Sequence, residues 1–193
     1  MRRFSALVLA LCLFPMNAAA AFPEDFDPLN TDTPYLQFFN EGGQTFQFEF
    51  NVYQPHQEVT RAQFVATIVD RLYPEGMDEC FLKLSPSRYS LLFADVLKDA
   101  PYGEQLCIAM RTGMIRGYPD ATFRPDAPIN FAEASKVLAK AYGLSEDVQT
   151  RPRAAWFQPY VDAMVRFGVL PGGIHLADAV TRADLSVMLS KLD

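Results

Sequence analysis

Three segments of the chain begin with a helix-capping residue that is followed three positions later by an acidic or amide side chain. In this arrangement the cap side chain accepts a hydrogen bond from a backbone N–H of the first helical turn, and the later side chain bonds back to the cap. One such capping box is weak evidence, but three in register predict an internal repeat. The segments are Thr60-Arg61-Ala62-Gln63, Asn130-Phe131-Ala132-Glu133 and Thr181-Arg182-Ala183-Asp184, the last being a weaker box because aspartate is shorter.

The residues of these segments that could bind a ligand are their arginines. Arg61 and Arg182 fall in the first helical turn, where the helix dipole disfavours a cation by a few tenths of a kcal/mol. An arginine beside unpaired N–H groups at a helix N-terminus would form a carboxylate site, since both groups attract the same anion. Two interpretations stay open, ligand-binding arginines and ordinary surface arginines, whereas the cap residues are fully explained as helix starts.

Short amphipathic helices must position these residues. Apolar residues recur at helical spacing on one face of residues 61–72. A helix is also expected from Phe131 to a closing glycine at 143, another over 102–112 before Gly113, and a last one after Thr181. The pattern predicts an all-α fold of three helix–loop–helix repeats, with the three capped helices as the central bundle.

The N-terminal part departs from this pattern. Residues 22–34 are rich in proline and acids and predict an extended tether. Residues 35–52 contain two apolar segments around Gly42-Gly43, the second alternating apolar and polar residues, which indicates a small β-hairpin.

The first residues have the layout of a secretory signal peptide. A basic start, an apolar run and the small residues Ala18 to Ala21 predict cleavage after Ala20 or Ala21. An uncleaved N-terminal anchor is the alternative, but the run is too short to span a membrane, and no later segment is long and apolar enough. A lipoprotein is rejected because bulky Leu11 precedes Cys12. We therefore expect a secreted protein of the cell envelope or cell surface.

Charge excludes general binding to polyanions. The net charge is −6, and removal of residues 1–21, which contain two arginines and no acids, makes it −8. The long-range field of such a protein repels nucleic acids and anionic membranes. An anionic ligand must therefore be captured by a local site.

Cys80 and Cys107 are the two cysteines outside the signal peptide. An even pair in an exported chain predicts a disulfide, which would stabilise the fold by about 3 kcal/mol on the chain-entropy model. Two buried free thiols are the alternative. The bond would hold an insertion against the side of the helix that contains Cys107.

The loop that begins Gly117-Tyr118-Pro119-Asp120, together with the capped helix after it, closely resembles the S-layer homology motif of bacterial cell envelopes. The resemblance covers about residues 48–72 and 93–193. On its pattern we expect a degenerate first motif over 35–74, an insertion over 75–92, a second motif over 93–144 and a third over 145–193.

The resemblance implies a function. Triplets of these motifs look like all-helical modules that bind secondary wall polysaccharides, often carrying a pyruvate ketal, in grooves between motifs. The family's Thr-Arg-Ala-Glu signature supplies the arginine of these grooves, but Phe131 replaces it in the second motif, and Ala121 replaces the usual loop glycine. The expected ligand-binding residues are Arg61, Arg182, Thr60, Thr181, Gln63, Asp184, Gly117, Tyr118, Asp120 and Trp156, the last having core packing as its simpler interpretation.

Three functions follow as hypotheses. The first is a non-catalytic envelope module that binds an anionic cell-wall glycan, without cofactor or metal. The second is an assembly module that binds other envelope proteins and keeps the fold without the glycan site, as Phe131 would allow. The third is an enzyme, which the sequence disfavours because it lacks a metal-ligand cluster, a nucleophile elbow and a phosphate-binding loop. A glycosidase with paired carboxylates remains compatible with the composition.

Overall fold

The computed structural model describes residues 54–77, 80, 93–97, 100–144 and 155–192. The signal peptide, the tether, the hairpin and most of the insertion lie outside these ranges, and their predictions stay untested. Five helices and no β-strand occur among the described residues, which confirms the all-α class. The helices are α2 (Arg61–Leu72), α3 (Gly103–Arg111), α4 (Phe131–Ala141), α5 (Gln158–Arg166) and α6 (Arg182–Ser190).

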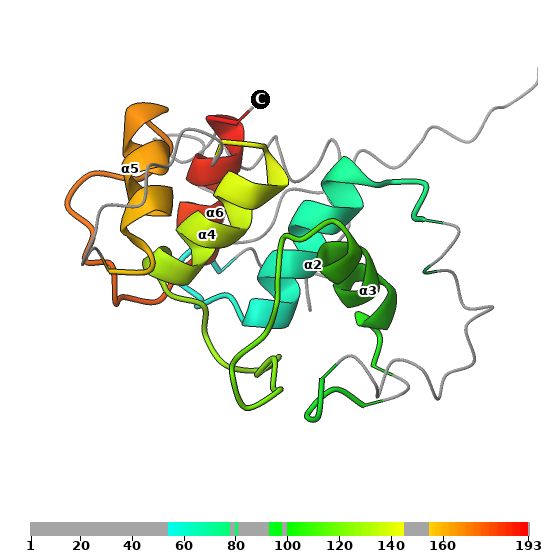
Figure 1. The fold of residues 1–193 in the computed structure, drawn as a ribbon. Coiled ribbons are helices and arrows are strands. Elements are labelled where there is room, and N and C mark those ends of the chain that lie inside the picture. The colour runs from blue at the N-terminus through cyan, green and yellow to red at the C-terminus, as the bar shows by residue number, and fades with distance from the viewer. Residues whose placement is uncertain (1–53, 78–79, 81–92, 98–99, 145–154, 193) are drawn as a thin grey trace, which may run out of the picture.

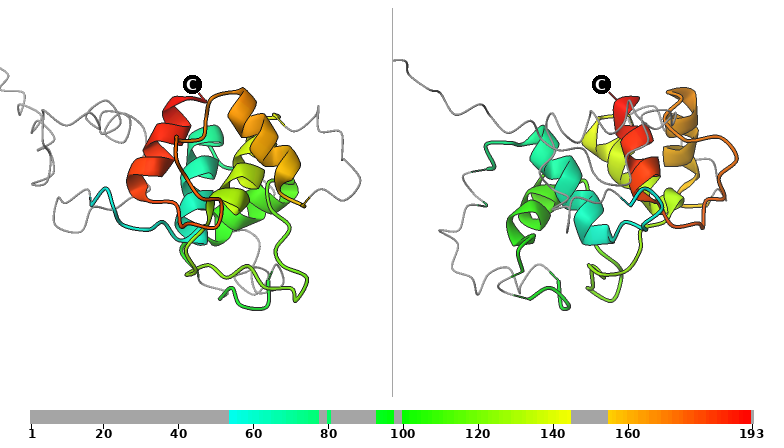
Figure 2. Two further views of the ribbon diagram at one scale, coloured as in Figure 1. Left: turned by 90° about the vertical axis from the view of Figure 1, so that its left-hand side faces the viewer. Right: turned by 180° about the vertical axis from the view of Figure 1, so that it is seen from behind.

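The helices form two groups around one core. Figure 1 and the right-hand view of Figure 2 show α2 and α3 on one side and α4, α5 and α6 on the other. Helix α2 packs against both α3 and α4, and α4 packs against α5, so α2 and α4 join the two groups. All five helices contribute large side chains that are fully buried, and so does the loop that contains Phe123. Those of the helices include Phe64, Ile68, Leu106, Ile108, Leu138, Met164 and Leu185.

The chain segments before α2, α4 and α6 meet in a closed ring of backbone hydrogen bonds. The N–H of Val59 donates to the carbonyl of Val180 at 2.8 Å, Val180 N–H to Ile129 at 2.8 Å, and Ile129 N–H to Val59 at 3.0 Å. All three side chains are fully buried. Because each of the three segments makes the same pair of bonds, the ring gives the loop–helix segments an approximate threefold arrangement at the centre of the fold.

All three capping boxes are complete. The side chains of Thr60, Asn130 and Thr181 accept from the backbone three residues ahead, and the side chains of Gln63, Glu133 and Asp184 accept from the cap N–H groups. The box at Asp184 is therefore as complete in its bonds as the other two, although its side chain is shorter. The helix starts at 61, 131 and 182 follow directly from these caps.

A disulfide joins Cys80 to Cys107, with a Cα–Cα distance of 5.7 Å. Both residues are buried, and Cys107 lies in α3. The bond therefore ties the segment after α2 to the side of α3, as the sequence indicated. Among the described residues, no helix has both the length and the apolar character needed to cross a membrane.

Candidate functional site

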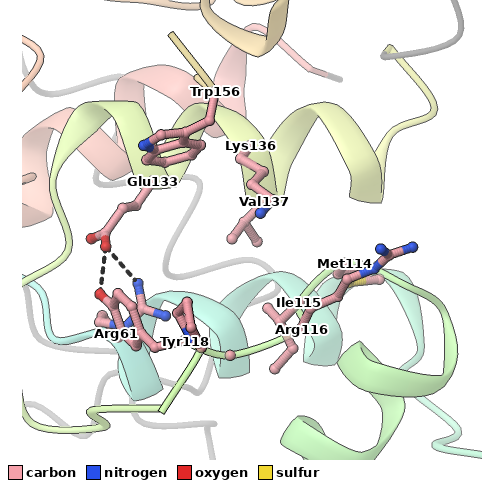
Figure 3. A pocket seen from close by; sticks show the side chains of 11 residues that line it. Arg61, Met114, Ile115, Arg116, Tyr118, Glu133, Lys136, Val137 and Trp156 are labelled. Carbon is pink, nitrogen blue, oxygen red and sulfur yellow. Dashed lines mark hydrogen bonds and ion pairs between the residues drawn. The ribbon is translucent and has the colours of Figure 1, made fainter. Parts of the chain in front are cut away.

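A pocket of about 390 Å³ opens where the start of α2, the middle of α4 and the loop before Tyr118 come together. Figure 3 shows Lys136, Val137 and Trp156 on one side of it and Arg61, Tyr118 and Ile115 on the other. The lining residues come from the start of α2, from residues 114–137 and from Trp156 ahead of α5. The lining residues are Arg61, Met114, Ile115, Arg116, Gly117, Tyr118, Pro119, Glu133, Lys136, Val137 and Trp156.

Arg61 is held rigidly in the wall of this pocket. Only 8% of the surface of Arg61 is exposed. Its Nε–H donates to the carbonyl of Phe123 at 2.8 Å, and its Nη1 lies 3.3 Å from Oε1 of Glu133. The guanidinium also stacks over the rings of Tyr118 and Phe123, at 4.7 and 4.9 Å from their centroids. Arg61 is therefore a buried, paired arginine, and the interpretation as an ordinary surface arginine is wrong.

Glu133 links the two sides of the pocket. Its carboxylate reaches from α4 to the hydroxyl of Tyr118 and to Arg61, as the dashed lines in Figure 3 show. The same carboxylate accepts from the N–H of Asn130 and completes the capping box of α4. Burial, followed by the hydrogen bond to Glu133, raises the pKa of Tyr118 to about 12. Tyr118 is therefore a neutral hydrogen-bond donor at physiological pH.

The helix N-terminus at this pocket has no free N–H groups in its first three positions. The N–H groups of Arg61 and Ala62 donate to the carbonyls of Ala127 and Pro125 at 2.9 and 3.0 Å, and the N–H of Gln63 donates to the cap Thr60. Helices α4 and α6 are closed in the same way by the loops at 176–178 and 55–57. The expectation that an arginine and free N–H groups act on one anion is therefore wrong for this helix start, because its N–H groups are already engaged within the protein.

Two further cations face the pocket, Arg116 and Lys136. Lys136 lies with its Nζ 5.3 Å from the centroid of the Trp156 ring. Burial lowers the pKa of Lys136, and the positive charges of Lys140, Arg116 and Arg61 lower it further. These neighbours mean that the pocket concentrates positive charge although the chain as a whole is acidic. An anion placed here would relieve that repulsion.

Trp156 is exposed to 56% and lines the pocket. Core packing, its simpler interpretation in the sequence, is therefore wrong. An exposed indole beside a lysine offers an apolar face and a nearby cation to the same ligand.

Gly117 has a backbone reason to be glycine. Its φ is +72°, and a Cβ there would lie 2.4 Å from Cε1 of Phe93 and 2.9 Å from the carbonyl oxygen of Thr122. The glycine lets the loop turn closely against Phe93 and so places Tyr118 next to Arg61. Its role in the pocket is to shape the loop.

The remaining predicted site residues do not line this pocket. Thr60, Gln63, Thr181 and Asp184 make the capping boxes of α2 and α6. Asp120 accepts from the N–H and hydroxyl of Thr122 and pairs with Arg124 on the surface of the loop. The hydrogen bonds from Thr122, and to a smaller extent the one from Arg124, lower the pKa of Asp120. Arg182 is buried at the start of α6, away from the pocket.

Sequence reasoning missed Arg116 and Lys136 as pocket residues and used Glu133 only as part of a cap. A signal for them was present. Lys136 follows Glu133 by three positions and therefore lies on the same face of α4. Arg116 directly precedes the glycine that fixes the loop. Among the described residues, no group of three His, Cys, Asp or Glu side chains could hold a metal ion.

Comparison with known proteins gives a family match and several relatives. Residues 92–135 match the model of the S-layer homology domain. A cellulosome-anchoring protein of Acetivibrio thermocellus is 31% identical over 90 residues, which are 40% of this chain and 20% of that protein. A surface-layer 125 kDa protein of Lysinibacillus sphaericus is 26% identical over 112 residues, 51% of this chain and 10% of that protein. A protein of Bacillus anthracis described as an uncharacterized cell wall amidase is 30% identical over 82 residues, 38% of this chain and 15% of that protein. The chain thus spans a fifth or less of the length of these curated relatives.

Proposed function

We propose that this chain, which carries an S-layer homology domain at residues 92–135, is a non-catalytic module of the cell envelope that binds an anionic cell-wall polysaccharide. The binding site is the pocket between α2 and α4. The module acts at the cell surface, as the names of the cellulosome-anchoring and surface-layer relatives suggest. It needs no cofactor.

One observation carries the proposal: the balance of charge in the pocket. Among the residues that the structure describes, three cations, Arg61, Arg116 and Lys136, line it with a single carboxylate, Glu133. That carboxylate is already engaged by Arg61, Tyr118 and the cap of α4. Arg116 and Lys136 thus face the pocket beside a carboxylate that Arg61 already neutralises. In a chain of net charge −6, such a local excess of positive charge fits a carboxylate group on a neutral sugar chain.

The roles of the residues follow from their contacts. Arg116 and Lys136 supply the attractive charge, and Tyr118 and Arg61 form a rigid part of the wall. Trp156 provides an apolar face for a sugar ring. The wall around them is preorganised, because Arg61 is fixed by Phe123 and Glu133 before any ligand arrives. A fixed site loses less conformational entropy on binding.

The test is sedimentation of the purified protein with isolated cell walls. Replacing Arg116 and Lys136 by alanine removes both charges without touching the Arg61–Glu133 pair, and we expect the affinity to fall by about tenfold or more, the effect of losing a charged hydrogen bond. Arg111→Ala with Lys191→Ala removes the same charge outside the pocket and should leave binding unchanged. Walls stripped of their acidic substituents should retain the wild type weakly. Unchanged retention of the Arg116/Lys136 variant would contradict the proposal.

A second function is favoured by the engagement of Arg61 with the protein itself and by Phe131 at the equivalent position of α4. In that case the fold serves as an assembly module that binds other envelope proteins. Crosslinking in intact envelopes separates the two: recovery of a protein partner, with no detectable binding of the purified wall polymer, would favour assembly.

A further inference from the structure

The pocket between α2 and α4 places cations around an exposed aromatic side chain. Nζ of Lys136 lies 5.3 Å from the centroid of the Trp156 ring, and Arg116 lines the same pocket. Glu133 does not compensate these two charges, because its carboxylate is already paired with Arg61. Such a surface fits a peptide that carries carboxylates on both sides of an apolar side chain.

The chain itself contains a segment of this composition. Residues 22–34 have four acidic residues and no lysine or arginine. Phe26 stands directly between Asp25 and Asp27, so the segment offers an aromatic ring flanked by carboxylates to an aromatic ring flanked by cations. The segment lies outside the described residues, and its charge is the complement of the charge of the pocket.

The length of the chain allows the two to meet. The described part of the chain begins at Gln54, seven residues before Arg61 in the pocket wall, so it begins at most about 25 Å from the pocket. Residues 34 and 54 are 20 positions apart, which corresponds to a coil of about 25 Å. If residues 35–52 instead form the predicted hairpin, its two ends meet, and the 13 residues of 22–34 still reach up to about 45 Å.

We propose that residues 22–34 bind the cationic pocket of their own chain, with their carboxylates at Arg116 and Lys136 and an apolar side chain against Trp156. The segment is then a tethered competitor of any anionic ligand. Its regulatory effect rests on the proposed function: the wall polymer must displace the segment, so only a polymer with many acidic groups binds well.

The strength of this competition follows from the tether. A linker whose coil length matches the span gives an effective concentration of about 1 mM. For a segment that binds with a dissociation constant of about 100 μM, this concentration weakens the binding of a free competitor about tenfold.

The experiment uses a synthetic peptide of residues 22–34 as the probe. It compares the chain without residues 1–21 with the same chain carrying Glu24→Gln, Asp25→Asn, Asp27→Asn and Asp32→Asn. Trp156 is the single tryptophan of the chain and lines the pocket, so its fluorescence reports binding. We expect the neutralised chain to bind the peptide at about 100 μM and the wild type to bind it at least tenfold more weakly.

Two controls test whether the effect belongs to the segment and to the pocket. Arg116→Ala with Lys136→Ala in the neutralised chain should abolish peptide binding, whereas Arg111→Ala with Lys191→Ala should not. The second control gives the wild type the same change in net charge at four exposed acids outside the pocket, and it should leave peptide binding weak. These substitutions are Glu58→Gln, Glu75→Gln, Asp126→Asn and Asp178→Asn.

The outcomes separate this inference from the proposed function. Equal binding of the peptide by the wild type and the neutralised chain would overturn the inference, as would a neutralised chain that does not bind the peptide. A suppression that grows with protein concentration would place the segment in the pocket of a second copy and would also overturn it. Sedimentation with isolated cell walls then tests the effect on the ligand, and the neutralised chain should be retained about tenfold more tightly. If the peptide results are as expected but neither chain is retained by the walls, the proposed function fails and the inference stands.

Discussion

Nη1 of Arg61 lies 3.3 Å from Oε1 of Glu133 across the junction between α2 and α4, and the two side chains are only 10% and 15% exposed. This pair joins the first capped helix to the second. It also explains how a cation is tolerated in the first turn of α2, since the carboxylate and the carbonyl of Phe123 offset the unfavourable helix dipole. Arg61 is thus part of the framework of the pocket as well as of its lining.

Loss of Arg61 should therefore destabilise the fold. We expect Arg61→Ala to lower the free energy of unfolding by about 3 kcal/mol, because it leaves the carboxylate of Glu133 buried without its partner. The double variant with Glu133→Gln should lose less than the sum of the two single changes, with a coupling energy above about 1 kcal/mol. Urea unfolding of the four proteins measures this cycle.

The exposed pair of Arg124 and Asp120, 52% and 53% exposed, provides the control. Arg124→Ala should have a much smaller effect, since surface ion pairs contribute little. Additive losses at Arg61 and Glu133 would show that the pair is not coupled. A cell-wall binding assay on Arg61→Ala alone would mix folding with binding, so Arg116 and Lys136 are the better sites for that test.

Tyr118 should make stability depend on alkaline pH. Its pKa is raised from 10.0 to about 12 in the folded protein, so the folded state keeps the proton in a range where the unfolded state has lost it. Its stabilising contribution is complete below pH 10 and is lost as the pH rises to 12. Unfolding free energies should fall more steeply across this window in the wild type than in Tyr118→Phe. Parallel curves would contradict the assignment.

Binding of an anionic glycan should weaken at high pH through Lys136. Its pKa lies below 10.5 in the free protein, through burial and neighbouring cations, and a bound anion favours the charged form. Affinity should therefore fall as the pH rises through that lowered pKa. Lys136→Arg stays charged throughout and should bind with little change up to pH 10.5. Titrations by Trp156 fluorescence at constant ionic strength give the comparison.

The disulfide between Cys80 and Cys107 closes a loop with a sequence separation of 27. On the chain-entropy model such a loop contributes about 3–4 kcal/mol, so replacing both cysteines by alanine should lower the Tm by roughly 10 °C. Scanning calorimetry with and without reductant measures this. Reductant should lower the Tm of the wild type and leave that of the variant unchanged; an equal response of both would place the stabilisation elsewhere.

Ala121 is held in a left-handed conformation, with φ +63°. Because its Cβ disfavours this region, Ala121→Gly should stabilise the protein by about 1 kcal/mol. Ala127, in the same loop but without a positive φ, is the matched control: Ala127→Gly should destabilise by about 0.5–1 kcal/mol through the greater freedom of the unfolded chain. Chemical denaturation distinguishes the two signs.

The local features of the fold could be predicted from the sequence. The helix from Arg61 to Leu72 begins and ends where the pattern placed it, and the helix expected over 102–112 spans 103–111. The caps at Thr60, Asn130 and Thr181 were found because a capping box lies within four consecutive residues. The pairing of Cys80 with Cys107 followed from there being only two candidates outside the predicted signal peptide.

The composition of the pocket was decided by the tertiary structure. Arg61, Arg116, Lys136 and Trp156 come from separate segments. The helical spacing of Glu133 and Lys136 places those two on one face of α4, but it does not indicate that Arg61 and Trp156 meet them there. The same holds for the N–H groups at the helix starts, which donate to carbonyls of loops far away in the sequence. Capping is a contact between neighbours in sequence, so the sequence determines it. Whether a helix end, an arginine or an indole is buried or open depends on residues far away in the chain, which only the packing of the helices and loops brings into contact.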